Sequence, residues 1–217
     1  MPLLTRRRAR LAAIALLVSV VAVPNAYLTL RSIGIVLSGA EAVDWHHFVQ
    51  ASSRVTQGGL YDFSADYGYR YSPVLAYAFA PLSLMGTLAW RLLHVVAALA
   101  LPTWPMRIVT LLSWPFWFDV EAGNIMVFVL LAAAWAIRGN AIGSGAFLVL
   151  TLLAPRPLML PVAACLLWKH PEMRIPFVTA LVVHTVLVAF SGWGPDWVST
   201  LLLSTDEIGS PLNAGPS

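Results

Sequence analysis

Long apolar runs, separated by short polar or proline-containing breaks, fill most of this 217-residue chain. The first is an uncharged stretch from Leu11 to Leu30, directly after the cluster Arg6-Arg7-Arg8-Ala9-Arg10. About 20 apolar residues cross the hydrocarbon core of a bilayer, and flanking arginines stay on the cytoplasmic side. The pattern predicts a first span over residues 11–37 with a cytoplasmic N-terminus. A cleaved signal peptide is the alternative, for which Pro24-Asn25-Ala26 is a poor cleavage site.

Residues 39–71 differ in kind because they carry six charged side chains: Glu41, Asp44, Arg54, Asp62, Asp66 and Arg70. Each charge would cost about 2.5–3.5 kcal/mol at the centre of a membrane helix. We therefore predict an extracytoplasmic loop after the first span. Its apolar positions recur at roughly helical spacing and then meet a glycine pair, which predicts an amphipathic helix on the membrane surface followed by an aromatic belt. These positions are Phe48, Val49, Val55 and Leu60, with Gly58-Gly59.

From Ser72 onward the apolar runs are short, several of them only about 11 to 15 residues against the 20 or so that a straight span needs. Short broken helices are tolerated at membrane depth where they line a protein-walled cavity. We predict an all-α polytopic transmembrane bundle, GT-C-like as argued below, in one membrane domain. Its remaining spans occupy residues 72–191, and 192–217 form a polar tail. The runs are 74–85, 88–101, 108–118, 125–137, 141–154, 158–168 and 175–190.

Composition narrows the class of protein further. The chain is 59% hydrophobic and only 11% charged, whereas a soluble domain carries about 25% charged residues. This excludes a soluble domain, a disordered tail, a coiled coil and a nucleic-acid binder. Basic loops at Arg138-Gly139 and Lys169 to Arg174 are predicted to be cytoplasmic. The protein is thus expected to be a multi-pass plasma-membrane protein whose reactive groups face the extracytoplasmic side.

Asp44 and the histidine pair that follows it are the first candidates for chemistry. A carboxylate held at the membrane surface beside aromatic residues can act as a general base on a hydroxyl. The alternative for Asp44 is a helix N-cap or a solvated acid. His46 and His47 have no Cys or third His near them in sequence, so neither a metal site nor a cofactor is predicted. Asp119 and Glu121, also predicted to be extracytoplasmic, are possible second acids.

Two further residues have an open choice of role. Arg156 lies between Pro155 and Pro157, where its guanidinium could bind a phosphate through two parallel hydrogen bonds or lie at an interface or extramembrane turn. Asn124 could bind a sugar or cap a helix. No motif for binding a nucleotide occurs in the chain.

Several short motifs, each weak alone, occur in order between Asp44 and Arg174. They are Asp44 with aromatic neighbours, Gly58-Gly59-Leu60-Tyr61-Asp62, Tyr69-Arg70-Tyr71-Ser72-Pro73 with Ala80-Pro81-Leu82, Gly123-Asn124-Ile125-Met126, and Ala154-Pro155-Arg156-Pro157-Leu158. In this order the chain resembles glycosyltransferase family 87, a group of GT-C membrane mannosyltransferases and relatives that use polyprenyl-phosphate sugars. Departures from the family motifs occur at Ser72, Asn124, Met126 and Ala154, where the family usually has Pro, Gln, Asn and Lys.

The resemblance implies inverting transfer of a sugar, expected to be mannose, from a polyprenyl phosphate to a cell-envelope glycolipid or glycan. Asp44 would then be the general base. Arg156, with His47 and Arg54, would bind the donor phosphate, and the remaining candidates would contact sugar or lipid: His46, Tyr61, Tyr69, Tyr71 and Asn124. Twelve arginines against one lysine are typical of a GC-rich bacterial source. Membrane lipids and the two substrates are the expected partners.

The family usually carries more spans after the region that matches Phe177 to Phe190, while this chain stops at Ser217. A shortened homologue, a truncated reading frame and one part of a split enzyme are all compatible with that. The alternative function is a non-catalytic GT-C-like subunit that binds lipid phosphate or a partner, and a partner subunit could supply the missing spans. A transporter is disfavoured because no internal repeat is visible.

Overall fold

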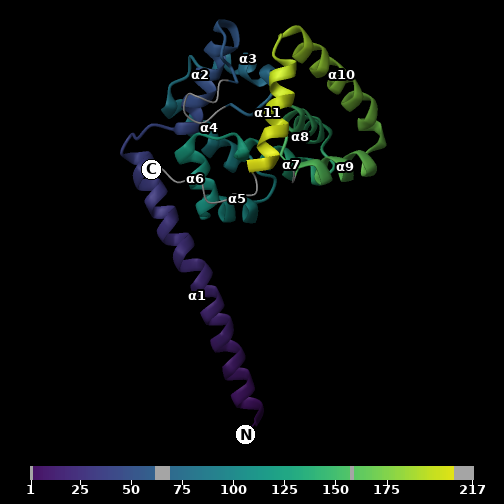
Figure 1. The fold of residues 1–217 in the computed structure, drawn as a ribbon. Helices are drawn as coiled ribbons and strands as arrows, with labels where there is room; N and C mark the ends of the chain where they lie inside the picture. The colour runs from purple at the N-terminus through teal and green to yellow at the C-terminus, as the bar shows by residue number, and fades with distance from the viewer. Residues whose placement is uncertain (1, 62–68, 157–158, 208–217) are drawn as a thin grey trace.

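The computed structural model contains helices and no strands over the residues that it describes, 2–61, 69–156 and 159–207 (Figure 1). The all-α prediction is confirmed. Side chains are described for 18–61, 69–156 and 159–202, so the N-terminal arginine cluster, Asp62 and Asp66 lie outside the described residues. The elements are α1 Pro2–Leu37, α2 Val43–Gln57, α3 Pro73–Leu82, α4 Thr87–Leu99, α5 Trp104–Leu111, α6 Trp114–Ala122, α7 Met126–Ile137, α8 Ala141–Leu153, α9 Met159–Lys169, the 3₁₀ turn Pro171–Met173, α10 Arg174–Phe190 and α11 Gly194–Glu207.

Two helical segments of the described chain are long and apolar enough to cross a membrane, Val18–Leu37 and Pro171–Phe190. A third candidate is the pair α3 and α4, which bends by 108° at the break between the two helices. Large apolar side chains of α1 and α10 are exposed, Leu30 at 69% and Phe190 at 88%, which is typical of helices that face lipid. The chain is therefore a membrane protein with two to three candidate spans. The direction in which they cross stays a prediction.

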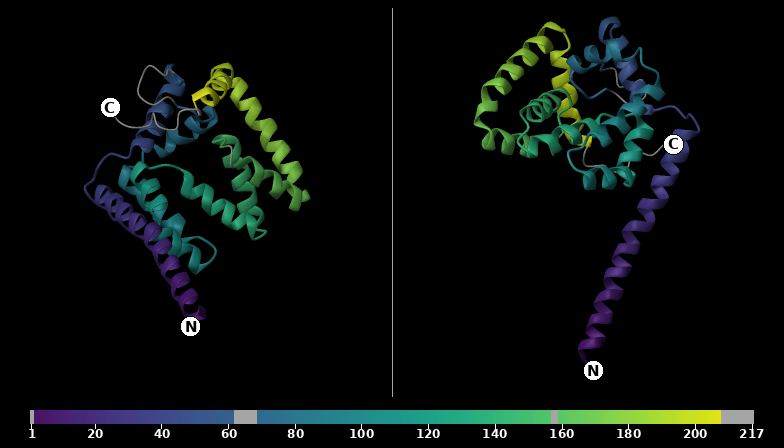
Figure 2. Two further views of the ribbon diagram at one scale, coloured as in Figure 1. Left: turned by 60° about the horizontal axis from the view of Figure 1, so that its bottom comes forward. Right: turned by 180° about the vertical axis from the view of Figure 1, so that it is seen from behind.

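The remaining helices are short, as the interrupted apolar runs predicted. The run 108–118 is divided at Ser113 into α5 and α6, because Pro115 has no N–H to continue a helix and lies instead in the first turn of α6. α7 and α8 form a tight antiparallel pair after a turn at Gly139, whose φ is +78°. The short helices gather into one body, from which the N-terminal half of α1 projects (Figures 1 and 2).

One face of α1 joins it to α6. The Asn25 side chain donates from Nδ2 to the Leu112 carbonyl at 3.0 Å and accepts from the Trp114 backbone N–H at 2.9 Å. Ser32, two turns further along the same face, is fully buried, and Val36 packs against the core of α4, α6 and α7. The described contacts of Asn25, Ser32 and Val36 thus attach the C-terminal half of α1 to the body.

The predicted amphipathic helix exists as α2, which ends at Gly58. Its apolar face does not lie on a membrane surface, as the sequence had suggested. Trp45, Phe48, Ala51 and Val55 are buried in a core shared mainly with α3. The prediction that Tyr61 and Tyr69 belong to an aromatic belt at the membrane interface is also wrong. Both side chains lie in the same core and are each 8% exposed. Burial suits these rings because each contributes a large apolar area to the core while its hydroxyl donates to a backbone carbonyl.

The C-terminal tail is a second correction. Residues 194–207 form α11, and both Trp193 and Trp197 pack against the core around α2. The Trp193 indole N–H donates to the Val55 carbonyl at 3.0 Å. The contacts of these two partly buried tryptophans make this segment part of the folded body. Residues 208–217 lie outside the described residues.

Candidate functional site

Four segments that are distant in sequence contribute to one polar cluster. Asp44 lies in the first turn of α2, Tyr71 precedes α3, Asn124 links α6 to α7, and Arg156 lies between α8 and α9. Asn124 Nδ2 donates to Asp44 Oδ2 at 2.5 Å, and Arg156 Nη2 donates to the Tyr71 hydroxyl at 2.7 Å. The charges of Arg156 and His47 both act on Asp44. We call Asp44, His47, Tyr71, Asn124 and Arg156 the site cluster.

Asp44 is not the N-cap of α2, because Ala42 occupies that position. Its carboxylate instead lies near the positive end of the helix dipole, which favours a negative charge there. Asn124 fixes one carboxylate oxygen, Oδ2. Among the described residues the other oxygen, Oδ1, has no hydrogen-bond partner. The half-buried carboxylate is therefore both oriented and able to accept a proton.

Asn124 is placed by the left-handed turn that ends α6. Gly123 has a φ of +72°, and a Cβ at this position would lie 2.8 Å from the Cβ of Trp45. Only glycine fits both the backbone and the contact. The Asn124 side chain uses its oxygen to accept from the Ile125 N–H at 2.7 Å and its amide to bind Asp44. Its two predicted roles, local capping and a polar contact in the site, thus occur together.

Stacked indole rings lie beneath Asp44 and Asn124. The Trp45 and Trp90 rings are 4.8 Å apart at their centroids, with 24° between their planes. Trp90 also donates its indole N–H to the Gly123 carbonyl at 2.8 Å. Both rings are buried, and their contacts hold together α2, α4 and the turn after α6, two of which carry Asp44 and Asn124.

Arg156 is exposed, while Tyr71, to which it donates, is packed against Phe48 with ring centroids 5.2 Å apart. The Tyr71 carbonyl accepts a hydrogen bond from the Tyr61 hydroxyl at 2.8 Å. Phe48 lies one helical turn beyond Asp44. The guanidinium is therefore held beside the carboxylate through Tyr71, and it keeps donors available for an anion.

Burial raises the pKa of the Asp44 carboxyl above its ordinary value of 3.8, against the opposing effects of the Asn124 hydrogen bond and the charges of His47 and Arg156. Burial also raises the pKa of the Tyr71 hydroxyl, and the Arg156 charge opposes this shift. A base with a raised pKa binds a proton more readily, which suits the acceptance of a proton from a hydroxyl.

Two predicted site residues, His46 and Arg54, lie apart from this cluster, whereas Tyr61 and Tyr69 contact its member Tyr71. His46 turns to Glu41, 2.7 Å away, and to Gln50, 2.5 Å away. Arg54 is ten residues beyond Asp44 on α2, or about 15 Å along the helix. Tyr61 and Tyr69 are buried and donate to backbone carbonyls of Tyr71 and Ser72, so they hold the loop before α3 in place. Neighbouring positions on a helix point in different directions, which separates His46 from His47.

The two possible second acids have different surroundings. Asp119 is buried, accepts from the Val127 N–H at 2.8 Å and lies 3.9 Å from the His94 ring. Burial raises the pKa of Asp119, and His94 opposes that shift. Glu121 lies near Arg91, which donates to the Glu121 backbone carbonyl at 3.1 Å. Neither carboxylate hydrogen-bonds a described residue of the site cluster, so their role as second acids stays a prediction.

Sequence reasoning missed three residues of α4. Arg91 and His94 are 5% and 0% exposed, and with Trp90 they form hydrogen bonds to backbone carbonyls around the site. The sequence did contain a signal for Arg91 and His94, because both are ionisable residues within the apolar run 88–101. Ionisable residues in such a run normally face the interior of a membrane bundle. The carbonyls bound by Arg91 are those of Ala40, Val120 and Glu121.

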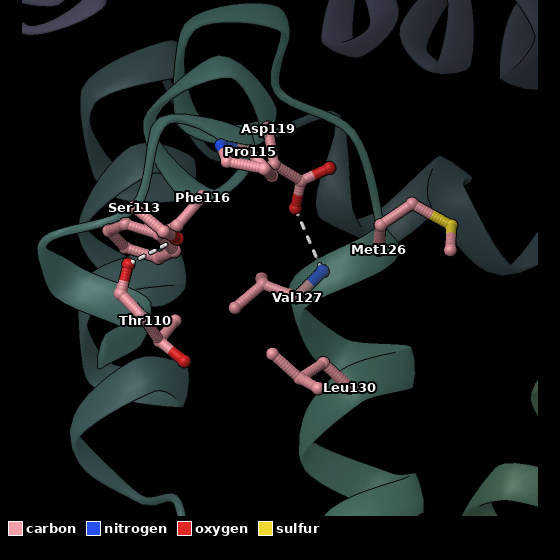
Figure 3. Close-up of a pocket in the computed structure, with 8 residues that line it drawn as sticks. All are labelled: Thr110, Ser113, Pro115, Phe116, Asp119, Met126, Val127 and Leu130. Atoms are coloured by element: carbon pink, nitrogen blue, oxygen red, sulfur yellow. Dashed lines mark hydrogen bonds between the residues drawn. The ribbon is translucent and has the colours of Figure 1, made fainter. Parts of the chain in front are cut away.

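A cavity of about 220 Å³ lies between α5, α6 and α7, apart from the site cluster (Figure 3). Asp119 borders it with one oxygen turned to the Val127 N–H. The other walls are almost entirely apolar, which suits a hydrocarbon group better than a charged one. The lining consists of Thr110, Ser113, Pro115, Phe116, Asp119, Met126, Val127 and Leu130.

No group of three His, Cys, Asp or Glu side chains that could hold a metal ion occurs in the part of the chain that the structure describes. No protein-family model, curated protein or solved structure matches this chain. The resemblance to family 87 therefore stays a prediction from the motifs, and a function has to be argued from the site cluster itself.

Proposed function

We propose that this protein is a membrane glycosyltransferase that moves a sugar from a polyprenyl phosphate to a hydroxyl of a cell-envelope glycolipid or glycan. The observation that carries the proposal is the pairing of an oriented, half-buried carboxylate, Asp44, with an exposed guanidinium, Arg156. A base for the acceptor and a cation for the leaving phosphate are the two groups that this reaction requires. The motif order noted above points to the same chemistry.

In the proposed reaction, Asp44 Oδ1 accepts the proton of the acceptor hydroxyl as its oxygen attacks the anomeric carbon. The bond between that carbon and the phosphate oxygen breaks, and the polyprenyl phosphate leaves with the bonding electrons. Attack opposite the leaving group inverts the anomeric centre. Arg156 offsets the added negative charge on the phosphate, and Asn124 keeps Oδ2 fixed throughout.

The direct test is sugar transfer in membranes that contain the full chain. Labelled polyprenyl-phosphate mannose is supplied with a crude envelope acceptor, and label in the glycolipid and glycan fractions is measured against membranes without the protein. Transfer above that background supports the proposal. Absence of transfer by folded protein, with this donor and with a pentose analogue, would contradict it.

Replacing Arg156 by Gln is expected to lower transfer about 10- to 150-fold, since a hydrogen bond to a charged group contributes about 1.5–3 kcal/mol. Rates with the labelled donor at matched protein abundance measure the change. Arg138→Gln is the control, because Arg138 is an exposed arginine at the end of α7. Equal losses in both variants would remove Arg156 from the site.

The transfer rate is expected to fall as pH drops through the raised pKa of Asp44, because the protonated acid cannot act as a base. Asn124→Ala removes a hydrogen bond that lowers this pKa, so the acid limb of the pH–rate profile should move to higher pH. Gln50→Ala, on the outer side of α2, should leave the limb in place. A limb that stays or moves to lower pH in Asn124→Ala would contradict the assignment.

The raised pKa of Asp44 acts in opposite directions on the transfer rate, which falls in acid, and on the stability of the fold, which acid increases. The native carboxyl of Asp44 holds its proton to higher pH than the unfolded one, so its contribution to stability is greatest below pH 3.8 and is lost as pH rises through the raised pKa. Acid should therefore suppress transfer without loss of folding from this group.

A non-catalytic subunit is the second candidate. Only 11% of the first candidate span and 17% of the second are buried by the rest of the described chain, which leaves apolar surface for lipid or a partner. This candidate predicts binding of polyprenyl phosphate, measured by retention of labelled lipid on purified protein, without transfer of sugar.

A further inference from the structure

Three chain segments that are distant in sequence bring cations to one end of the helical body. Arg138 directly follows α7, Lys169 ends α9, and Arg174 begins α10 (Figure 1). The turn after α7 meets the turn after α9, because a Cβ at Gly139 would lie 3.9 Å from Cε1 of the His170 ring. We call Arg138, Lys169 and Arg174 the basic end.

The protein itself does not balance the charge of the basic end. All three side chains are exposed, and those of Arg138 and Lys169 form no hydrogen bond or ion pair with any residue that the structure describes. Arg174 donates from Nε to a backbone carbonyl at 3.0 Å and keeps its terminal N–H groups available. Glu172, the only acid from α7 to α10, is paired with His170 at 3.1 Å. The basic end therefore carries an excess of positive charge at neutral pH.

Large apolar side chains surround these cations and are unusually exposed. Ile137, Trp168 and Ile175 are direct sequence neighbours of the three cations, and Ile142 follows the same turn as Arg138. All four are between 73% and 83% exposed. At a bilayer boundary such apolar groups enter the hydrocarbon, tryptophan lies at the interface, and cations reach the headgroups. The combination fits a lipid surface better than a soluble acidic partner, which would leave the apolar groups in water.

We propose that the basic end binds the headgroups of anionic phospholipids, with Trp168 anchored beside it at the hydrocarbon boundary. Guanidinium and ammonium groups form charge-assisted hydrogen bonds with phosphate oxygens, and a headgroup with a net negative charge is attracted more strongly than a zwitterionic one. The sequence predicts that these loops are cytoplasmic, and the cytoplasmic leaflet is the one with a negative surface potential.

This surface is separate from the site cluster. Asn124 and Arg156 lie just before α7 and α9, whereas the basic end lies after the last turns of those helices. Lipid binding at the basic end therefore neither requires sugar transfer nor contributes a group to it, and Arg138→Gln stays a suitable control for the transfer rate.

The test measures which lipid lies beside the basic end. The one cysteine of the chain, Cys165, is exposed on α9 one helical turn before Lys169, so a fluorophore attached there reports locally. The full chain is reconstituted in phosphatidylcholine bilayers. Quenching is then compared between phosphatidylglycerol and phosphatidylcholine probes that carry the same nitroxide on an acyl chain. No enzymatic activity is needed for this readout.

The phosphatidylglycerol probe should reach half-maximal quenching at a mole fraction at least about fivefold lower than the phosphatidylcholine probe. One cation near an anionic headgroup contributes about 1 kcal/mol, which corresponds to about this factor. Salt at about 1 M should remove most of the difference, since the Debye length falls to about 3 Å. Equal quenching by the two probes at low salt would leave the cations to water or a soluble anion and would overturn the proposal.

Variants assign the effect to the basic end. Lys169→Gln should reduce the preference for phosphatidylglycerol by up to about fivefold, and Lys169→Arg should retain it. Arg31→Gln is the matched control, because Arg31 is an exposed arginine on α1, which packs against α6. Equal reductions in Lys169→Gln and Arg31→Gln would indicate attraction by net charge alone. That result, or a preference that survives replacement of all three cations by Gln, would overturn the assignment.

Discussion

Replacing Asp44 by Asn is expected to lower sugar transfer by about 100- to 10,000-fold, the range that a positioned general base contributes. The substitution keeps the size of the side chain, and its amide oxygen can still accept from Asn124. The amide cannot accept the acceptor's proton at neutral pH. Initial rates with labelled polyprenyl-phosphate mannose, at matched abundance in membranes, measure the effect.

Glu41→Gln is the control for this variant, since Glu41 is an exposed acid just before α2 and its contact is with His46. It should retain nearly full transfer. Donor binding by the Asp44→Asn protein should also persist, because Arg156 is unchanged. Equal transfer by Asp44→Asn and the unmodified protein would remove Asp44 from the chemistry and leave the carboxylate a structural role in α2.

Gly123→Ala should reduce the free energy of unfolding by about 2–5 kcal/mol. A left-handed residue with a Cβ costs about 1–2 kcal/mol, and overpacking adds about 1–3 kcal/mol. The added methyl would meet the Cβ of Trp45 at 2.8 Å and that of Ala42 at 3.0 Å, both at the rigid start of α2. Reversible unfolding in mixed micelles, followed by tryptophan fluorescence, measures the loss.

Gly86→Ala is the matched control. Gly86 precedes α4 with a φ of −69°, and a Cβ there would meet nothing within 4 Å. Its unfolding free energy should change by less than about 1 kcal/mol. Equal stability of the two alanine variants would show that the turn after α6 relaxes freely and that Gly123 is not needed to place Asn124.

Much of the helical order follows from local signals. Prolines and glycines divide the apolar sequence, and α3, α4, α7, α8, α9 and α10 follow the predicted runs. Local chemistry is enough for this because a missing N–H or a positive φ acts within one or two residues. The sequence also named Asp44, Tyr71, Asn124 and Arg156 as candidates, and the structure joins them in two hydrogen-bonded pairs, while their roles stay predictions.

The support beneath the site could not be predicted in this way. His94 contacts residues about 30 positions away, and Arg91 reaches Ala40, 51 positions away. Such pairings depend on how α4 packs beneath α2 and α6, and no sequence spacing reports that. The misplaced aromatic belt has the same origin, because rings suited to a membrane interface are equally suited to a protein core.

The attachment of α1 also has a consequence for the order of biosynthesis. The two hydrogen-bond partners of Asn25 are 87 and 89 residues further along the chain. At about 5–20 residues per second, the ribosome makes them roughly 4 to 18 seconds after Asn25. During that interval the polar amide has no partner from its own chain, a condition that is costly in lipid. A nascent chain must therefore extend into α6 before both hydrogen bonds of the Asn25 side chain can form.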